Sequence, residues 1–134
     1  MANLLDRLPP EFGTVPYNGA AIPDGSHDLT AGANCQRFAY AVLAHFGLSL
    51  PPWWSSELWQ DTALTIVVTT FEPLDLLLFN RTDEPFGAHL GVYAGQGGVL
   101  HLAKSVGIPA IWPVVEFARR DDYRVLVGGK RVLQ

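Results

Sequence analysis

Cys35, His89 and His101 are the residues of this chain whose types and spacing fit nucleophilic catalysis. Cys35 is the only cysteine among the 134 residues, and the segment Gly32-Ala33-Asn34 before it interrupts the preceding pattern. An apolar spacing typical of a helix begins at once after this break. A thiol in the first turn of a helix lies at the positive end of the helix dipole, which favours the thiolate. We therefore expect Cys35 to be partly exposed and reactive.

The two histidines lie on short segments of alternating apolar character, separated by a glycine-rich turn. A turn over residues 95–98 would pair these segments as an antiparallel hairpin. In such a hairpin His101 can orient the His89 ring as a neutral hydrogen-bond partner. Cysteine at a helix start, histidine and a second polar partner together meet the needs of cysteine-nucleophile hydrolysis. Gly91, on the same strand face as His89, is expected to leave room for another chain or a ligand.

Each of these residues also has a simpler interpretation. A lone cysteine is more often a small buried apolar residue, and a lone histidine on a strand is more often structural. A zinc site formed by Cys35, His89 and His101 would lack an obvious fourth ligand and the common ligand spacing. We predict neither a metal site nor a cofactor.

The elements that must position these residues change in type along the chain. The pattern predicts a helical turn over residues 3–7, a helix over 35–46 and a helix from Ser55 or Ser56 toward Leu64. Trp53, Trp54 and Trp59 surround the start of that second helix; core packing is the simpler role for them, and a substrate wall is the alternative. Strand patterns follow over 74–80, 89–94, 99–104 and 123–127, with a short helix over 113–119 between the last two.

Helices first and a strand meander afterwards indicate an α+β fold, in which N-terminal helices pack on an antiparallel sheet. A length of 134 residues fits one domain over 1–134.

The net charge of −4 argues against nucleic-acid binding, and no apolar run reaches the ~18 residues of a membrane span. Asp6, Pro9 and Pro10 interrupt the region where a signal peptide would need an apolar stretch, so the chain as given is expected to be cytoplasmic or exported by another route. Nothing in the sequence specifies an oligomeric state.

Four stretches of the sequence resemble the NlpC-type family of papain-like cysteine peptidases, whose best-known members cut the peptide stems of bacterial cell walls. The resemblance covers about residues 15–132. The stretches are Pro16-Tyr17-Asn18-Gly19, Asn34-Cys35-Gln36-Arg37-Phe38 with Gly47-Leu48-Ser49-Leu50-Pro51, Pro73-Leu74-Asp75-Leu76-Leu77-Leu78-Phe79, and Ala88-His89-Leu90-Gly91-Val92-Tyr93 with Leu100-His101-Leu102.

The resemblance implies a papain-like α+β fold and a role for each matching residue. Cys35 would be the nucleophile, His89 the general base and acid, and His101 the orienting third member. Tyr17 would lie near the site and support the oxyanion or the substrate. The implied reaction forms a thioester at a peptide or amide carbonyl, with the backbone N–H of Cys35 as oxyanion donor. A peptidoglycan fragment is the substrate that the resemblance suggests.

The sequence departs from the family beside the nucleophile. Asn34 and Gln36 stand where the family has the aspartate and serine implied to help bind a substrate amine, and Arg37 replaces a glycine. Arg37 either engages a substrate carboxylate or projects into solvent. Three alternatives stay open. The first is a thioester-based acyltransferase, although the circularly permuted members have histidine before cysteine. The second is a non-catalytic binding module with the same fold, and the third, a variant of the same enzyme class, is a wall-degrading effector associated with a tail or secretion system.

Overall fold

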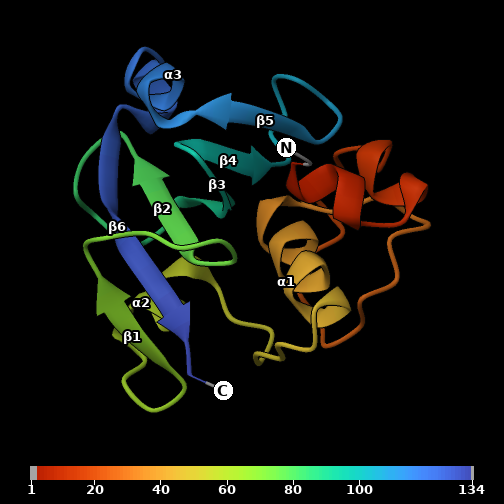
Figure 1. The fold of residues 1–134 in the computed structure, drawn as a ribbon, viewed down its shortest axis with the longest axis horizontal. Coiled ribbons are helices and arrows are strands. Elements are labelled where there is room, and N and C mark those ends of the chain that lie inside the picture. The colour runs from red at the N-terminus through yellow and green to blue at the C-terminus, as the bar shows by residue number, and fades with distance from the viewer. Residues whose placement is uncertain (1–2, 134) are drawn as a thin grey trace.

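A six-stranded antiparallel sheet forms the centre of the computed structural model, which describes residues 3–133 (Figure 1). The strands lie in the order β1-β6-β2-β3-β4-β5. Their bounds are β1 Thr65–Val68, β2 Leu76–Asn80, β3 His89–Gly95, β4 Gly98–His101, β5 Ala110–Pro113 and β6 Val125–Val132. The helices are α1 Cys35–His45, α2 Ser55–Gln60 and α3 Val114–Ala118, with 3-10 turns η1 Leu4–Arg7, η2 Pro10–Gly13 and η3 Asp121–Tyr123. The predicted α+β class is confirmed.

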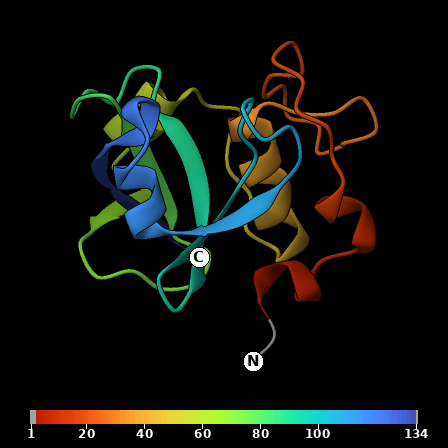
Figure 2. The same ribbon diagram turned by 90° about the horizontal axis from the view of Figure 1, so that it is seen from above.

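Helix α1 covers one face of the sheet, packing against β3 and β4 (Figures 1 and 2). Its buried side chains include Phe38, Val42 and Leu43, and they pack on the alternate sheet residues Leu90 and Val92. The helix ends at His45, and Gly47 follows in the left-handed region at φ 84°, which favours glycine after a helix. This packing makes the main core of the protein.

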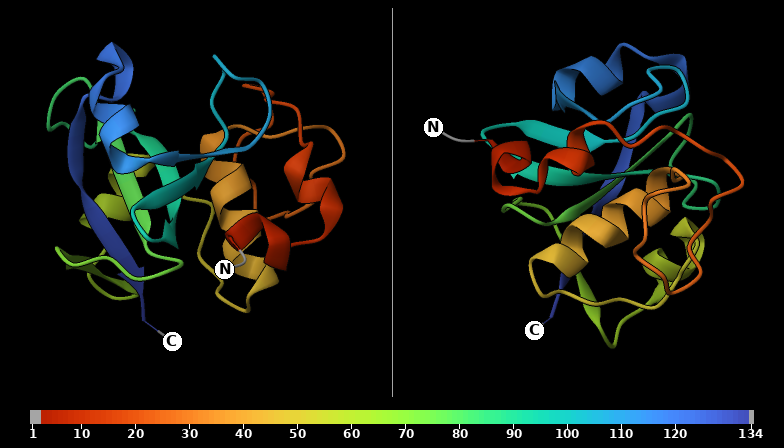
Figure 3. Two further views of the ribbon diagram at one scale, coloured as in Figure 1. Left: turned by 45° about the horizontal axis from the view of Figure 1, so that its top comes forward. Right: turned by 90° about the vertical axis from the view of Figure 1, so that its right-hand side faces the viewer.

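A second, smaller core covers the other face of the sheet. Leu77, Phe79 and Val99 point to this side and pack around Phe117 of α3, whose ring stacks on Phe79 at 4.0 Å between centroids. Figures 2 and 3 show α3 on the side of the sheet away from α1. Burial of both faces explains why β2 carries a continuous apolar run where a half-exposed strand would alternate.

The segment from η1 to Asn34 wraps along the side of α1 that faces away from the sheet (Figures 2 and 3). A backbone bond ties it to the loop after β4, because Tyr17 N–H donates to Gly107 O at 2.8 Å. Within the segment, Tyr17 forms a parallel bridge with Ala33, the residue before Asn34. These bonds bring Tyr17 beside the start of α1.

Two unpredicted strands, the last strand and one helix end differ from the sequence-based expectation. The strand predicted over 123–127 runs instead from Val125 to Val132, because Tyr123 belongs to η3. Helix α2 stops at Gln60 because Asp61 turns the chain; its Oδ2 accepts from the N–H groups of Leu64 and Thr65. Strand β1 begins there and pairs with β6, and the short β5 pairs with β4. The pattern of the sequence had predicted neither of these edge strands. Ser55 opens α2 but does not cap it, since its hydroxyl donates to Ala88 O instead.

Candidate active site

Cys35 is the first residue of α1. Asn34 caps the helix: its Oδ1 accepts from the N–H of Arg37 at 2.8 Å. This cap leaves the N–H of Cys35 at a position that has no acceptor inside the helix. The Cys35 side chain is partly exposed and faces a cavity.

The cavity has a volume of about 550 Å³ and joins α1 to the loop before β3. Its wall is formed by aromatic, small and uncharged polar residues, and it includes both Cys35 and His89. The lining residues are Tyr17, Asn34, Cys35, Gln36, Trp54, Ser55, Phe86, Gly87, Ala88, His89 and Tyr123.

The Cys35 thiol is neutral at rest. Burial raises its pKa to about 11, while hydrogen bonds from the backbone N–H groups of Leu90, Gln36 and Cys35 itself act in the opposite direction. The expectation of a thiolate favoured by the helix start is therefore not met in the resting protein. Desolvation of the sulfur by burial outweighs the nearby N–H donors.

The hairpin of β3 and β4 brings the two histidines together. His89 Nε2 lies 2.9 Å from His101 Nδ1, and the ring planes meet at 85°. His101 is 1% exposed, and its Nε2 has no hydrogen-bond partner among the described residues. Since His89 uses Nε2 for this contact, its Nδ1 is the ring nitrogen left for other chemistry.

Both imidazoles are neutral near pH 7. Burial lowers the pKa of His89 to about 4. The pKa of His101 falls to about 2, mainly through burial and further through the nearby charges of His89 and Arg120. A neutral His89 is able to accept a proton, and His101 stays a neutral hydrogen-bond partner for it.

An aromatic group surrounds this pair, and sequence reasoning had missed it. The ring of Tyr123 stacks on His89 at 4.5 Å and 25° between planes, while Trp112 and Phe117 lie 4.2 Å and 4.7 Å from His101. These rings come from β5, α3 and η3, and they cover the sheet face opposite α1. They exclude water from the hydrogen bond between the histidines.

Gly91 does not leave the open space that its small size suggested. A Cβ added there would lie 2.5 Å from Val99 Cγ1, so the neighbouring strand β4 fills the position. The expectation of room for a ligand at Gly91 was wrong. Glycine is required because β3 and β4 approach closely beside the two histidines.

Asn34 and Gln36 belong to one buried chain of hydrogen bonds. Asn34 Nδ2 donates to Gln36 Oε1 at 2.8 Å, and Gln36 Nε2 donates to Ser55 Oγ at 3.0 Å. The Ser55 hydroxyl in turn donates to Ala88 O at 2.6 Å, next to His89. The chain links the start of α1 to the start of β3, and thus the cysteine to the histidine. Both residues line the cavity with Cys35.

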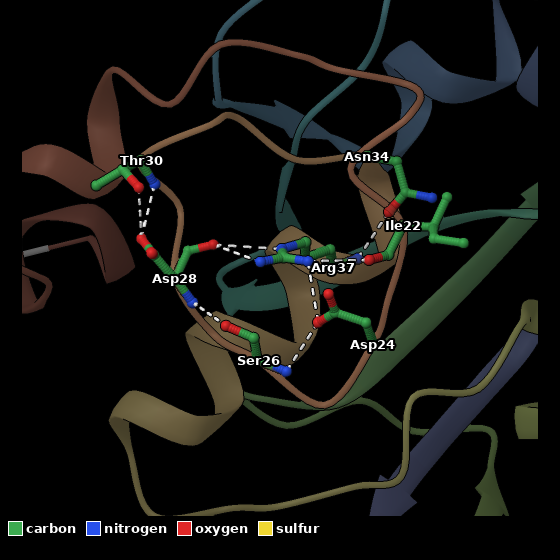
Figure 4. Close-up of polar contacts among 7 residues, drawn as sticks. All are labelled: Ile22, Asp24, Ser26, Asp28, Thr30, Asn34 and Arg37. Carbon is green, nitrogen blue, oxygen red and sulfur yellow. Dashed lines mark hydrogen bonds and ion pairs between the residues drawn. The ribbon is translucent and has the colours of Figure 1, made fainter.

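Arg37 lies outside the cavity and is bound by the chain itself (Figure 4). Its guanidinium donates to Ile22 O and, twice, to Asp28 O, and it pairs with the Asp24 carboxylate at 3.0 Å. Only 12% of its side chain is exposed. The structure does not bring Arg37 together with Cys35 and His89, and it neither offers the guanidinium to a ligand nor leaves it in solvent.

Tyr17 is brought to the cavity wall beside Cys35. Burial raises the pKa of its phenol, and ionisation of the nearby Cys35 thiol raises it further. The hydroxyl is therefore protonated and able to donate. Tyr17, Asn34, Cys35, Gln36 and His89 thus share one cavity, with His101 directly behind His89.

Within residues 3–133, no group of three or more His, Cys, Asp and Glu side chains is arranged to hold a metal ion. The same residues include no helix that is long and apolar enough to cross a membrane.

Comparisons with known proteins identify relatives of the fold. No family model matches the sequence, and no curated protein matches it. Among solved structures, an NlpC/P60 family protein from Bacillus cereus superposes with a TM-score of 0.67 at 19% identity, over 92% of this chain and 37% of that chain. The NlpC/p60 domain of the peptidoglycan hydrolase SagA gives a TM-score of 0.59 at 20% identity, over 92% of this chain and 91% of that domain. The peptidoglycan hydrolase RipB from Mycobacterium tuberculosis gives 0.61 at 19% identity, over 98% of this chain and 64% of that chain.

These likenesses establish the architecture that the sequence motifs suggested. The chain spans well under half of the Bacillus cereus protein but nearly the whole SagA domain. Helix α1 begins with Cys35, and the β2-β3-β4 meander that follows carries His89 at the start of β3 and His101 at the end of β4. The protein therefore has the NlpC/P60 fold.

Proposed function

We propose that this protein is a cysteine hydrolase that cleaves a peptide or amide bond through a thioester on Cys35. The observation that carries the proposal is the shared cavity of Cys35 and His89, with His89 held by His101 at 2.9 Å. A nucleophile, a neutral base and a partner that orients the base are the parts that such a reaction needs.

The first step starts from neutral groups. As Cys35 Sγ attacks the substrate carbonyl carbon, its proton passes to His89 Nδ1, while the His89 Nε2–H donates to His101 Nδ1. The carbonyl oxygen becomes an oxyanion, for which the Cys35 N–H at the start of α1 is the natural donor. Tyr17, which lines the same cavity as a protonated phenol, is a second candidate donor.

The second step releases the products. The oxyanion collapses, the C–N bond breaks and the proton on His89 passes to the departing amine. A water molecule then attacks the thioester while His89 accepts its proton, which gives the acid and restores the thiol. An acyltransferase would differ only here, with an amine or alcohol in place of water.

The substrate follows by analogy from the solved structures. SagA and RipB are named as peptidoglycan hydrolases, so a cell-wall peptide is the first candidate for this chain. The fold alone does not select this substrate.

The test is a mass-spectrometric assay with muropeptides and with short N-acylated peptides. We expect cleavage products that carry one added water, and an acylated Cys35 peptide after rapid quenching. Cys35→Ala, checked for an unchanged thermal transition, should give neither. Products that carry an added amine acceptor would favour the acyltransferase. Ligand binding without any covalent adduct would favour the binding module.

A further inference from the structure

The cavity beside Cys35 carries no formal charge near neutral pH. None of the described residues that line it is Asp, Glu, Lys or Arg. His89 is neutral because burial lowers its pKa to about 4, and burial likewise keeps the Cys35 thiol protonated. A charged substrate group that enters this space would lose water without meeting an opposite charge.

The side-chain polar groups of Asn34, Gln36 and Ser55 in the wall already have partners in the protein. Asn34 Oδ1 accepts from the Arg37 N–H, and Gln36 Oε1 accepts from Asn34 Nδ2. The Ser55 hydroxyl receives a hydrogen bond from Gln36 and donates to Ala88 O. An ammonium group would therefore compete with this buried chain for acceptors.

Arg37 is the cationic residue closest to Cys35 in the sequence, but its guanidinium lies outside the cavity. Arg37 follows Cys35 by two positions, but its guanidinium is bound to Asp24 and to the carbonyl oxygens of Ile22 and Asp28 (Figure 4). A substrate carboxylate would thus also find no partner of opposite charge in the cavity wall.

The cavity wall does present two large exposed aromatic side chains. Trp54 is 48% exposed and Phe86 is 72% exposed, and both line the cavity together with Cys35. Aromatic rings that line a cavity and remain open to solvent gain free energy when an apolar group covers them. They come from the start of α2 and from the loop before β3, which flank the nucleophile and the base.

We propose that this cavity selects an uncharged, N-acylated peptide or amide whose apolar group is held by Trp54 and Phe86, and that it rejects a free amine or a carboxylate at the same position. The inference rests on the proposed function, whose substrate class it narrows. It assigns to Trp54 and Phe86 a binding role.

The test uses three peptides of one apolar sequence: N-acetylated, with a free amino terminus, and N-succinylated. Binding to Cys35→Ser, in which no turnover occurs, is measured by titration calorimetry. We expect the N-acetyl peptide to bind about tenfold more tightly than either charged form, since each charged group would stay unpaired in the cavity. Equal binding, tighter binding of a charged form, or no binding of the N-acetyl peptide would overturn the inference.

Three variants and one control test which residues produce the preference for the N-acetyl peptide. Trp54→Ala and Phe86→Ala should each weaken binding of the N-acetyl peptide about fivefold or more. Val67→Ala is the matched control, because Val67 is 56% exposed on β1 and does not line the cavity. Gln36→Glu places a carboxylate in the wall and should shift the preference toward the free amine, with folding checked by its thermal transition. An unchanged preference in Gln36→Glu would count against the inference.

Cleavage by the wild type is measured separately. Selective binding without cleavage or a thioester would leave the specificity of the cavity standing and refute the hydrolase. Cleavage of all three peptides at equal rates would support the hydrolase and refute the selection.

Discussion

His89 faces His101 through one ring nitrogen, Nε2, which lies 2.9 Å from His101 Nδ1 with the rings nearly perpendicular. His101 remains neutral because burial lowers its pKa to about 2. It therefore cannot take the proton from His89, and when His89 is protonated, His101 Nδ1 accepts the hydrogen bond from His89 Nε2–H. This relationship separates the expected effects of the two histidines.

Replacement of the two histidines should have unequal effects on the proposed hydrolysis. His89→Ala removes the base and should lower kcat by at least about a hundredfold. His101→Asn keeps an acceptor near Nε2 and should retain activity within about tenfold of the wild type, whereas His101→Leu should lose more. Steady-state kinetics on variants with matched thermal transitions would measure this. Equal and complete loss in all three would argue that His101 does more than orient.

Alkylation of Cys35 should depend steeply on pH. Because burial raises the pKa of the thiol to about 11, the thiolate fraction is small at pH 6 and grows as the pH rises. We expect the rate of reaction with iodoacetamide to increase about tenfold per pH unit between pH 6 and 9. The rate is followed by intact-protein mass spectrometry. A fast, pH-independent reaction down to pH 5 would instead reveal a thiolate paired with protonated His89.

Tyr123 should act as a positioning residue for His89. Its ring stacks on the imidazole at 4.5 Å and helps to keep water away. Tyr123→Ala should lower kcat about three- to tenfold, in line with the loss of one aromatic contact, and Tyr123→Phe should restore it. The pKa of His89, followed by NMR, should rise from about 4 toward its usual value in Tyr123→Ala. An unchanged His89 pKa would show that Tyr123 does not shield the ring.

Loss of Arg37 should affect stability and leave substrate binding intact. The guanidinium ties Asp24 and the carbonyl oxygens of Ile22 and Asp28 to α1. Arg37→Met should lower the free energy of unfolding by about 1.5–3 kcal/mol, the range for hydrogen bonds to a charged group. Arg119→Met, at a side chain that is 75% exposed, should change it by less than about 0.5 kcal/mol. Urea denaturation measures both. A raised KM with unchanged stability would instead indicate that Arg37 contacts the substrate.

The sequence allowed the placement of Cys35, His89 and His101 in the fold to be predicted because local rules specify it. A glycine-rich break marks the start of α1 at Cys35, and a short turn pairs β3 with β4 and so brings His89 to His101. These relationships depend on neighbours in the chain, which periodicity and turn residues reveal.

The environment of those residues depends on contacts between distant segments, and the sequence pattern did not reveal it. Tyr123 of η3 contacts His89 of β3 although the two lie far apart in the sequence. Arg37 is held by the loop before α1, through Ile22 and Asp28. The burial that keeps Cys35 protonated likewise depends on protein packed around it from other segments. The helix start considered alone predicts a lowered pKa for the Cys35 thiol, whereas burial raises it.

The protonated state of Cys35 also has a consequence for resistance to oxidants. Peroxides attack the thiolate far more readily than the thiol, and sulfenic acid formation is the first step toward irreversible damage. A cysteine whose pKa is raised by burial exposes little thiolate near neutral pH. The burial that raises the pKa of Cys35 therefore also protects the only thiol of the chain from oxidation.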